Sequence, residues 1–485
     1  MFWRGVVGYL PVNVAQGIVG LLTIVVFTRV LTPAQYGAYA LGFSAMTLVH
    51  TGLFTWTEAA MARFQARAAE DGDTPDYMAT LYRCWAVLAA VFPIVAGLLV
   101  WLVPLPAGSK QAVAAAMAAI LFRSLARLAQ ERRRAAGEVT SAALLDVIQT
   151  VGGFAIGAIM ALMGAGGAAP LIGAGGIAAL CIAVVLPKEL KLTRGGHFEK
   201  ARAATYLAYG LPVAGSLILA LVIAATDRFL LAAFLNEQAV GVYHAGYSLA
   251  NRTLDVVFIW LGMAGGPAMV AALERGGEEA LAKTASEQAS FMLLLTLPAA
   301  AGLALVARPL AQVMVGPDLA AGAAQVTPWV AFAGLLSGLT TYYFHQAFTL
   351  GRRTHLLMIA MAVPAGANVA LNLFLIPRFG LSGAMWSTAA SYALGAVTAF
   401  ALGRRAQPLP IPWNTLARAG ASAALMALAV SQVPAWGGPA ELFGKAAVGM
   451  VVYGLAAWLL DAGGVRGQGL NLVRGLKGRL GGAAA

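Results

Sequence analysis

The chain has 485 residues, of which 60% are hydrophobic and only 11% are charged. This composition leaves too little polar surface to cover a water-soluble globule, so it excludes a soluble protein and predicts an all-α protein that crosses a membrane many times. The formal net charge of +12 would favour nucleic-acid binding in a soluble protein, but in a membrane protein it is first a signal of topology.

The predicted elements are apolar helices separated by short loops. A hydrocarbon core about 30 Å thick requires about 20 apolar residues per helix, and the chain contains fourteen runs of this kind. The predicted spans cover residues 9–31, 37–57, 79–103, 112–130, 142–163, 168–186, 205–234, 239–268, 286–307, 325–350, 356–376, 382–402, 413–432 and 441–461. The first run has no small-residue cleavage site behind it, so we interpret it as a retained helix rather than a signal peptide.

Basic residues are distributed unevenly between the two sets of loops. Most of the 32 lysines and arginines lie on the side of the N-terminus, and the opposite loops contain only Lys110, Arg308, Arg378 and Lys445. Because loops rich in Lys and Arg remain in the cytoplasm, we expect both termini to be cytoplasmic. The positive charge then reports topology, and nucleic acid is not an expected partner.

A motif near the first loop occurs twice. Residues 37–44 (GAYALGFS) reappear as residues 241–248 (GVYHAGYS), and two shorter pairs keep nearly the same spacing. The shorter pairs are residues 10–12 with 211–213 and residues 93–98 with 298–303. Three pairs in the same order indicate an internal duplication. Since six predicted spans separate the copies, both keep one direction through the membrane, which predicts a parallel repeat.

The duplication predicts the domain organisation. The expected parts are a first six-helix lobe over residues 1–203, a second six-helix lobe over 204–406, two extra spans within 407–464 and a basic cytoplasmic tail over 465–485. In the tail, Leu470, Val473, Leu476 and Leu480 share one face of a helix. We expect this face to lie along the inner leaflet.

Ionisable residues inside the predicted spans are the candidates for function. Each costs about 2.5–3.5 kcal/mol at the centre of a bilayer, so such a residue normally faces water, a ligand or a partner. The cations are Arg252, Arg228, Arg29 and Arg123, and the carboxylates that could couple transport to an ion are Asp255, Asp227 and Asp146. Arg252 is the strongest candidate for contacting a substrate in a hydrated cavity, because about a dozen residues separate it from either end of its span.

These candidates also have structural interpretations. Arg252 and Asp255 could neutralise each other as an i, i+3 pair. Arg228 could pair with its neighbour Asp227 or with another helix.

Positions near span ends give further alternatives. Arg29 lies close enough to the outer interface for its side chain to reach the headgroups, and Arg123 lies toward the inner interface. Asn368 and Asn372 are four residues apart on one helical face, which predicts an interhelical hydrogen bond.

Several catalytic patterns are absent from the sequence. It contains neither GxxxxGK[ST] nor HExxH, and Cys84 and Cys181 both lie in apolar surroundings without a CxxC motif, so we expect no ATP site, metal, disulfide or cofactor. The acidic residues Asp71 and Asp73 lie in a short loop without a nucleotide-binding domain, which indicates a solvated loop. The outer loops are too short for an external catalytic domain. We therefore expect a protein that is not an enzyme.

Three motifs in order resemble the polysaccharide flippases of the multidrug/oligosaccharidyl-lipid/polysaccharide (MOP) superfamily. The first is RVLTP at residues 29–33 with YGAY at 36–39, and the second is Asp227-Arg228 followed by VGVY at 240–243. The third combines Asn368 and Asn372 with residues 376–377, 379–380 and 383–384 in the eleventh and twelfth spans. The resemblance extends over the whole chain and includes the count of fourteen spans.

This resemblance implies a flippase of the bacterial inner membrane. Such a protein moves an undecaprenyl-pyrophosphate-linked oligosaccharide from the cytoplasmic to the periplasmic leaflet, for O-antigen, capsule, exopolysaccharide or adhesin synthesis. Its expected partners are the polyprenyl-pyrophosphate-linked glycan, the lipid bilayer, and a polysaccharide polymerase and glycosyltransferases. Rocking of two lobes around a hydrated, cationic cavity would give alternating access. Arg252 is then the residue that we expect to contact the pyrophosphate.

Alternative functions remain open from the sequence. A multidrug or cation antiporter of the same superfamily would share the two lobes but would need a more acidic cavity. A lipid II flippase and a membrane-embedded glycosyl-transferring enzyme are further alternatives, and the second would need a long outer loop with carboxylates.

Overall fold

The computed structural model describes residues 2–102 and 105–467, and every regular element in these residues is helical. The α-helices are α1 (Phe2–Val30), α2 (Pro33–Leu53), α3 (Thr55–Glu70), α4 (Thr74–Leu102), α5 (Ala107–Ala135), α6 (Val139–Leu162), α7 (Ala169–Lys191), α8 (Lys200–Phe234), α9 (Glu237–Leu305), α10 (Ala307–Met314), α11 (Pro317–Leu339), α12 (Gln346–Leu350), α13 (Thr354–Phe379), α14 (Leu381–Ala406), α15 (Trp413–Ser431) and α16 (Gly438–Leu459). The predicted class, an all-α polytopic membrane protein, is confirmed. The apolar residues of the predicted tail helix lie outside the described residues.

Within the described residues the predicted spans lie mainly on helical chain, but helix boundaries differ in several places. The second predicted span breaks at Phe54, and α3 then continues to Glu70 through residues that we expected to form a loop. The eighth and ninth predicted spans are joined in α9, where Gly277 has a φ of 68°. Strong helix formers on both sides of this glycine allow helix to continue up to the turn, and glycine adopts a positive φ without strain. By length and composition, ten helices in the described chain could cross a membrane.

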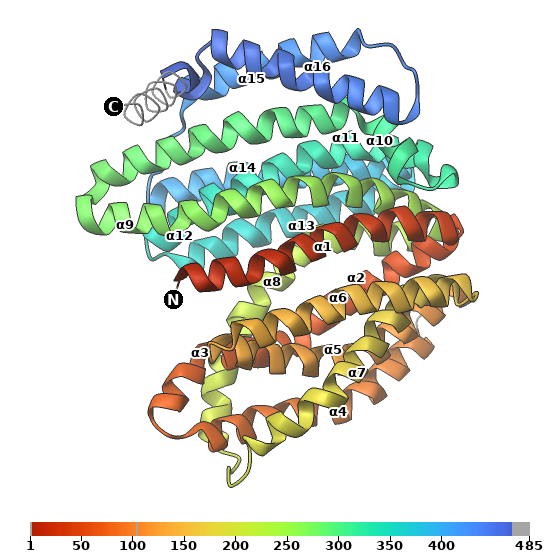
Figure 1. The fold of residues 1–485 in the computed structure, drawn as a ribbon, viewed down its shortest axis with the longest axis vertical. Helices are drawn as coiled ribbons and strands as arrows, with labels where there is room; N and C mark the ends of the chain where they lie inside the picture. The colour runs from red at the N-terminus through yellow and green to blue at the C-terminus, as the bar shows by residue number, and fades with distance from the viewer. Residues whose placement is uncertain (1, 103–104, 468–485) are drawn as a thin grey trace, which may run out of the picture. The chain divides into compact units, whose positions relative to one another are not determined.

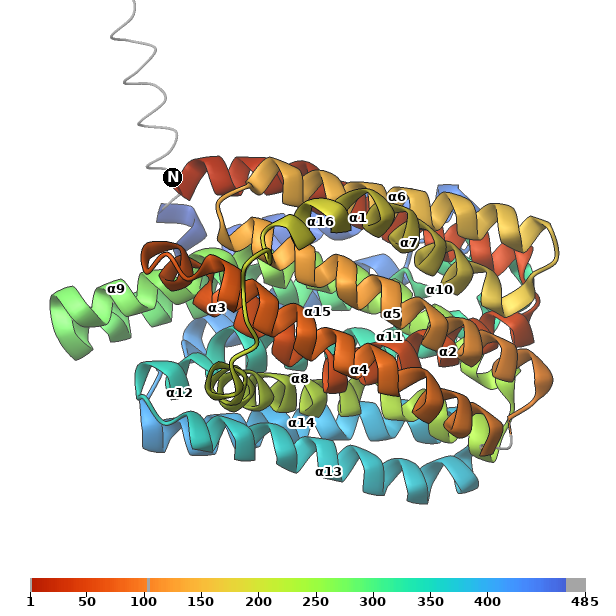
Figure 2. The same ribbon diagram turned by 90° about the horizontal axis from the view of Figure 1, so that it is seen from below.

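The chain divides into two compact units. One contains residues 1–245, 315–319 and 365–384, and the other contains residues 246–314, 320–364 and 385–485. In the first unit, α5 packs against α2, α3 and α7, and α6 packs against α1 and α7 (Figure 2). In the second unit, α15 packs against α16 (Figure 1). The first unit contains residues 1–203, the whole first predicted lobe, together with segments of the second, whereas the other unit contains no residue of the first lobe. The lobe boundary after residue 203 stays a prediction.

A capping box separates α1 from α2. Thr32 Oγ1 accepts a hydrogen bond from the backbone N–H of Gln35 (3.3 Å), and Gln35 Oε1 accepts one from the backbone N–H of Thr32 (3.0 Å). Pro33, the first residue of α2, has no N–H to satisfy and a φ suited to a helix start. These residues fix the turn that leads into the first copy of the repeated motif.

We expect Thr32→Ala to lower the free energy of unfolding by about 1 kcal/mol, because it removes the side-chain acceptor at the N-cap of α2. Thr23→Ala is the matched control, since the Thr23 hydroxyl donates only to the backbone oxygen of Val19 within α1. Thermal unfolding of both variants in detergent checks the difference. Equal loss in the two variants would show that the cap contributes nothing specific.

Candidate functional site

The two copies of the repeated motif meet at a pair of glycines. A Cβ atom at Gly37 in α2 would lie under 3.0 Å from the backbone oxygen of Glu237, at the start of α9. A Cβ at Gly241 in α9 would in turn lie under 3.0 Å from the backbone oxygen of Pro33, at the start of α2. The contact is therefore reciprocal, as expected for two related segments that cross at equivalent positions. Only glycine permits this approach of the backbones.

Two further contacts link the first predicted lobe to the second at this point. The carboxylate of Glu237 accepts hydrogen bonds from the backbone N–H (3.0 Å) and the hydroxyl of Ser109, near the start of α5. Thr28 Oγ1, near the end of α1, accepts one from the backbone N–H of Gly316 (2.8 Å). We call this set the repeat junction: Thr28, Gly37, Ser109, Glu237, Gly241 and Gly316. The predicted topology places all six at the outer ends of the spans.

A buried carboxylate lies beside the repeat junction. Asp227 in α8 has no exposed surface, and its two oxygens accept hydrogen bonds from Tyr243 Oη in α9 (2.5 Å) and Asn372 Nδ2 in α13 (2.5 Å). Asn372 Nδ2 also donates to Asn368 Oδ1, one turn earlier (3.0 Å). The interhelical hydrogen bond expected for the two asparagines is thus present, with Asp227 as its acceptor. The carboxylate connects three helices.

The α8–α9 hairpin explains why Asp227 and Tyr243 meet. Both lie eight residues from Leu235, the residue that follows the end of α8. In two antiparallel helices, equal distances from the turn give equal depth, here about 12 Å along the helix axis. Asn236 stabilises the turn, since its Oδ1 accepts a hydrogen bond from the backbone N–H of Ala239 (2.9 Å).

Arg228 forms a second layer of contacts around the same hairpin. Its Nε donates to His244 Nδ1 (3.1 Å), and its Nη1 donates to the backbone oxygen of Ala224. The His244 ring in turn lies 5.5 Å from the ring centroid of Tyr36 and 5.9 Å from that of Tyr39. Through His244, the second copy of the motif packs against Tyr39 of the first copy and against Tyr36, the residue just before that copy. Arg228 is therefore part of the contact between the copies.

The Asp227 cluster contains donor and acceptor groups that protein contacts do not use. Among the described residues, Asn368 Nδ2 and Asn372 Oδ1 are buried without a hydrogen-bond partner. An unpaired buried polar atom costs free energy, so such atoms in a native protein often mark a site for water or an ion. One carboxylate with amide and hydroxyl oxygens suits a proton or a hard cation rather than a transition metal. In the described chain, no three His, Cys, Asp or Glu residues gather as metal ligands would.

The first predicted lobe has its own group of charges. Arg123 in α5 is half-buried and interacts electrostatically with Arg127, Asp146 and Glu58. Glu58 lies in α3 and accepts a hydrogen bond from His50 Nε2 (2.7 Å), and Asp146 in α6 is buried. The structure therefore brings the candidates Arg123 and Asp146 into one neighbourhood. Cations and carboxylates are mixed there, so the region is not purely cationic.

The other candidates lie apart from these clusters. Arg29 is exposed beside the repeat junction, and its Nη1 donates to the backbone oxygen of Val25 (2.8 Å). Arg252 and Asp255 are exposed on α9, within the second unit. Asp255 accepts a hydrogen bond from Asn251 Nδ2 (2.5 Å). The hydrogen-bond donor to Asp255 is therefore Asn251, while Arg252 interacts with the same carboxylate electrostatically, so the i, i+3 pair stays a prediction.

Sequence reasoning missed four residues of these contacts: Tyr243, His244, Glu237 and Ser109. Tyr243 and His244 belong to the repeated motif, and both lie 16 residues after their partners in α8. This spacing is centred on the turn between α8 and α9, so it could have predicted that these residues lie opposite each other in the hairpin. The partnership of Ser109 with Glu237 spans 128 residues and leaves no local pattern.

Comparisons with known proteins assign the chain to a family. The family model described as "Polysaccharide biosynthesis protein" matches residues 24–320. No curated protein sequence matches the chain significantly.

Solved structures share the fold at low sequence identity. The lipid II flippase MurJ in an inward closed conformation matches with a TM-score of 0.75 and 12% identity, over 93% of this chain and 98% of MurJ. An inward-facing multidrug resistance MATE transporter of the MOP superfamily matches with a TM-score of 0.61 and 13% identity, over 80% and 97% of the two chains. A MOP superfamily transporter from Pyrococcus furiosus gives 0.54 and 15%, over 83% and 92%. With its family match over more than half of its length and this architecture, the chain belongs to the Polysaccharide biosynthesis protein family and has the fold of the MOP superfamily.

Proposed function

We propose that this protein is a flippase that moves an undecaprenyl-pyrophosphate-linked oligosaccharide repeat unit from the cytoplasmic to the periplasmic leaflet of a bacterial inner membrane. The family match carries the proposal, because it joins polysaccharide biosynthesis to a fold that a lipid II flippase also has. The protein would bind and move its cargo without changing it chemically, and so would not be an enzyme. The positive-inside distribution supports cytoplasmic termini.

The chemistry of the cargo explains the need for intramembrane arginine. A pyrophosphate and a sugar chain cannot cross hydrocarbon unaided, whereas a prenyl tail can remain in lipid. The arginine guanidinium stays charged when partly desolvated and binds phosphate oxygens through two parallel hydrogen bonds. Arg252 and Arg29 are exposed, and Arg123 is half-buried, so these three are the more available cations. Arg228 is buried and hydrogen-bonded to His244, which favours a structural role in the same region.

Asp227 is the carboxylate best placed to couple transport to an ion. Its neutralisation by a proton or a cation would change contacts with α9 and α13 next to the repeat junction, where the two motif copies meet. A proton or cation bound at Asp227 could therefore favour either the closed or the open conformation of the repeat junction. Coupling of transport to an ion requires such a preference. Asp255 and Asp146 remain the other candidates.

The enzymes that make and use the transported lipid-linked oligosaccharide are the expected partners of the protein. Glycosyltransferases must supply the lipid-linked oligosaccharide on the cytoplasmic side, and a polysaccharide polymerase must consume it outside. Consumption outside would pull net transport in the outward direction even without an ion gradient.

We expect Arg252→Ala to reduce surface polymer about tenfold at equal protein level, because it removes a charge-assisted contact with the pyrophosphate. Arg252→Lys should retain part of the activity, since it keeps the charge but loses the planar fork. Arg378→Ala is the matched control: Arg378 is also exposed, near the end of α13, and its Nη1 donates to the backbone oxygen of Phe374 (2.8 Å). Quantification of surface polymer in a strain lacking the chromosomal copy checks these outcomes. Normal polymer in Arg252→Ala would remove Arg252 from the proposed substrate contacts.

The same strain separates this function from its alternatives. An antiporter of organic cations would alter resistance to cationic dyes and leave surface polymer unchanged. A lipid II flippase would be needed for cell-wall synthesis rather than for polymer. Either outcome would replace the proposed substrate while leaving the fold assignment intact.

A further inference from the structure

A cavity of about 300 Å³ lies among α4, α5 and α7 in the first unit. Its walls are mainly apolar and include Tyr82, Trp85, Leu125, Leu186 and Leu190. Helix α5 packs against both α4 and α7, and its Leu125 lines the cavity between them. A volume of this size is at the lower end of the range for sites that hold small molecules or parts of them.

The cavity lies where the membrane-facing surface meets the predicted cytoplasmic end of the bundle. Its residues on α4 follow soon after the helix start at Thr74, and those on α7 precede the helix end at Lys191. Farther along the same helices, Val87 is 65% exposed and Val184 is 72% exposed. In a polytopic membrane protein, such apolar surface contacts acyl chains. The cavity is therefore adjacent to lipid of the inner leaflet.

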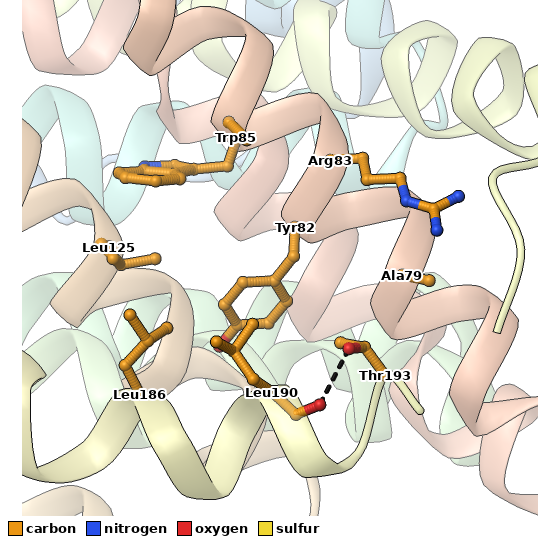
Figure 3. A pocket seen from close by; sticks show the side chains of 9 residues that line it. Ala79, Tyr82, Arg83, Trp85, Leu125, Leu186, Leu190 and Thr193 are labelled. Atoms are coloured by element: carbon orange, nitrogen blue, oxygen red, sulfur yellow. Dashed lines mark hydrogen bonds between the residues drawn. The ribbon is translucent and has the colours of Figure 1, made fainter. Parts of the chain in front are cut away.

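One side of the cavity is cationic. Figure 3 shows the Arg83 guanidinium on the side of the cavity opposite Leu125 and Leu186. Arg83 is exposed, and no carboxylate in the described part of the chain forms an ion pair with it. The nearby Asp76 is engaged instead by the backbone N–H of His197 (2.6 Å).

A cluster of buried charged side chains next to the cavity stabilises its wall. Glu189 is fully buried and accepts hydrogen bonds from Arg132 Nε (3.0 Å) and Nη2 (2.9 Å) and from Arg133 Nε (3.2 Å). Tyr82, whose ring lines the cavity, donates its hydroxyl to the same carboxylate at 3.5 Å. Trp85 Nε1 donates to Ser124 Oγ (2.9 Å). The two large aromatic walls are thus oriented before any ligand enters.

We propose that this cavity binds one anionic phospholipid of the inner leaflet, with an acyl chain between α4 and α7 and the phosphate on Arg83. Apolar walls suit the chain, and an arginine without a carboxylate partner suits the phosphate. Basic pockets between transmembrane helices on the cytoplasmic side are suited to anionic headgroups. A zwitterionic lipid offers the same chain, but its amine offsets the phosphate charge. None of the arginines proposed to contact the cargo lines this cavity.

Quenching of Trp85 fluorescence by brominated lipids tests this site. The full-length protein in detergent is titrated with phosphatidylglycerol carrying brominated acyl chains and, in parallel, with brominated phosphatidylcholine. We expect phosphatidylglycerol to reach half-maximal quenching at about fivefold lower concentration, the effect of one added cation near an anionic headgroup. Trp85→Phe should remove this difference, because the other tryptophans contact both lipids alike.

Two variants and one control separate the headgroup contact from the chain contact. Arg83→Ala should abolish the preference for phosphatidylglycerol, and Ala86→Phe should weaken quenching by both lipids, because Ala86 lines the cavity. Arg63→Ala alters another exposed arginine, on α3, and should leave the preference unchanged. Equal quenching by the two lipids, an unchanged preference in Arg83→Ala, or an equal loss in Arg63→Ala would overturn the assignment.

Discussion

Asp227→Asn is expected to abolish the dependence of transport on an ion gradient while leaving the fold intact. Asparagine has nearly the same shape as aspartate, and its oxygen can still accept the hydrogen bond from Tyr243. It carries no charge, so neither a proton nor a cation would be needed to neutralise it in the buried site. A gradient of 100 mV contributes about 2.3 kcal/mol per charge moved, which corresponds to about fiftyfold accumulation of substrate. The variant should lose that factor.

Transport into vesicles with imposed proton, sodium or electrical gradients measures this effect. Asp318→Asn, which alters an exposed carboxylate at the start of α11, is the control and should keep full coupling. Asp255→Asn and Asp146→Asn distinguish the other candidates. If Asp227→Asn keeps its response to the gradient and one of those two loses it, the coupling site lies elsewhere.

Gly37→Ala is expected to lower the free energy of unfolding by about 2 kcal/mol and to impair transport. The added methyl group would lie under 3.0 Å from the backbone oxygen of Glu237, and backbone atoms cannot move aside as a flexible side chain can. The helices must therefore separate at the repeat junction. A junction that cannot close would stop a cycle that alternates between closed and open ends.

Gly52→Ala is the matched control because Gly52 lies in the same helix. A Cβ there would lie 3.5 Å from Ile218 Cδ1, an ordinary contact, so the variant should be as stable as the wild type or about 0.5 kcal/mol more stable. Thermal unfolding in detergent and transport in vesicles compare the two. Wild-type stability and transport in Gly37→Ala would mean that the glycine contact has no role in the closed junction.

Local sequence signals predicted where helices lie but not where each helix begins and ends. Hydropathy located each apolar run, because burial in lipid requires a fixed length of apolar helix. It could not show that α3 extends to Glu70 or that α9 continues past residue 268, since polar helices and turns outside the membrane have similar composition. Those boundaries depend on tertiary packing.

The sequence predicted which residues belong to the candidate site, but it did not predict which of them form hydrogen bonds with one another. Asp227 stood out because a carboxylate inside an apolar run is costly. Its partner Asn372 lies 145 residues away, and only the packing of α13 against α8 brings it there. For Asp255, the sequence analysis considered only Arg252, three residues earlier, whereas the hydrogen bond comes from Asn251, four residues earlier. Spacing limits the possible partners, while side-chain direction selects among them.

Translocation of a lipid-linked oligosaccharide by the purified protein tests the central claim most directly. The substrate is an undecaprenyl-pyrophosphate-linked oligosaccharide with a fluorescent sugar, placed in vesicles with and without the protein, and a membrane-impermeant quencher reports the fraction in the outer leaflet over time. We expect the protein to exchange this substrate between leaflets much faster than protein-free vesicles do, and Gly37→Ala to slow the exchange. Exchange no faster than in protein-free vesicles, with the protein folded and correctly inserted, would contradict the proposed function.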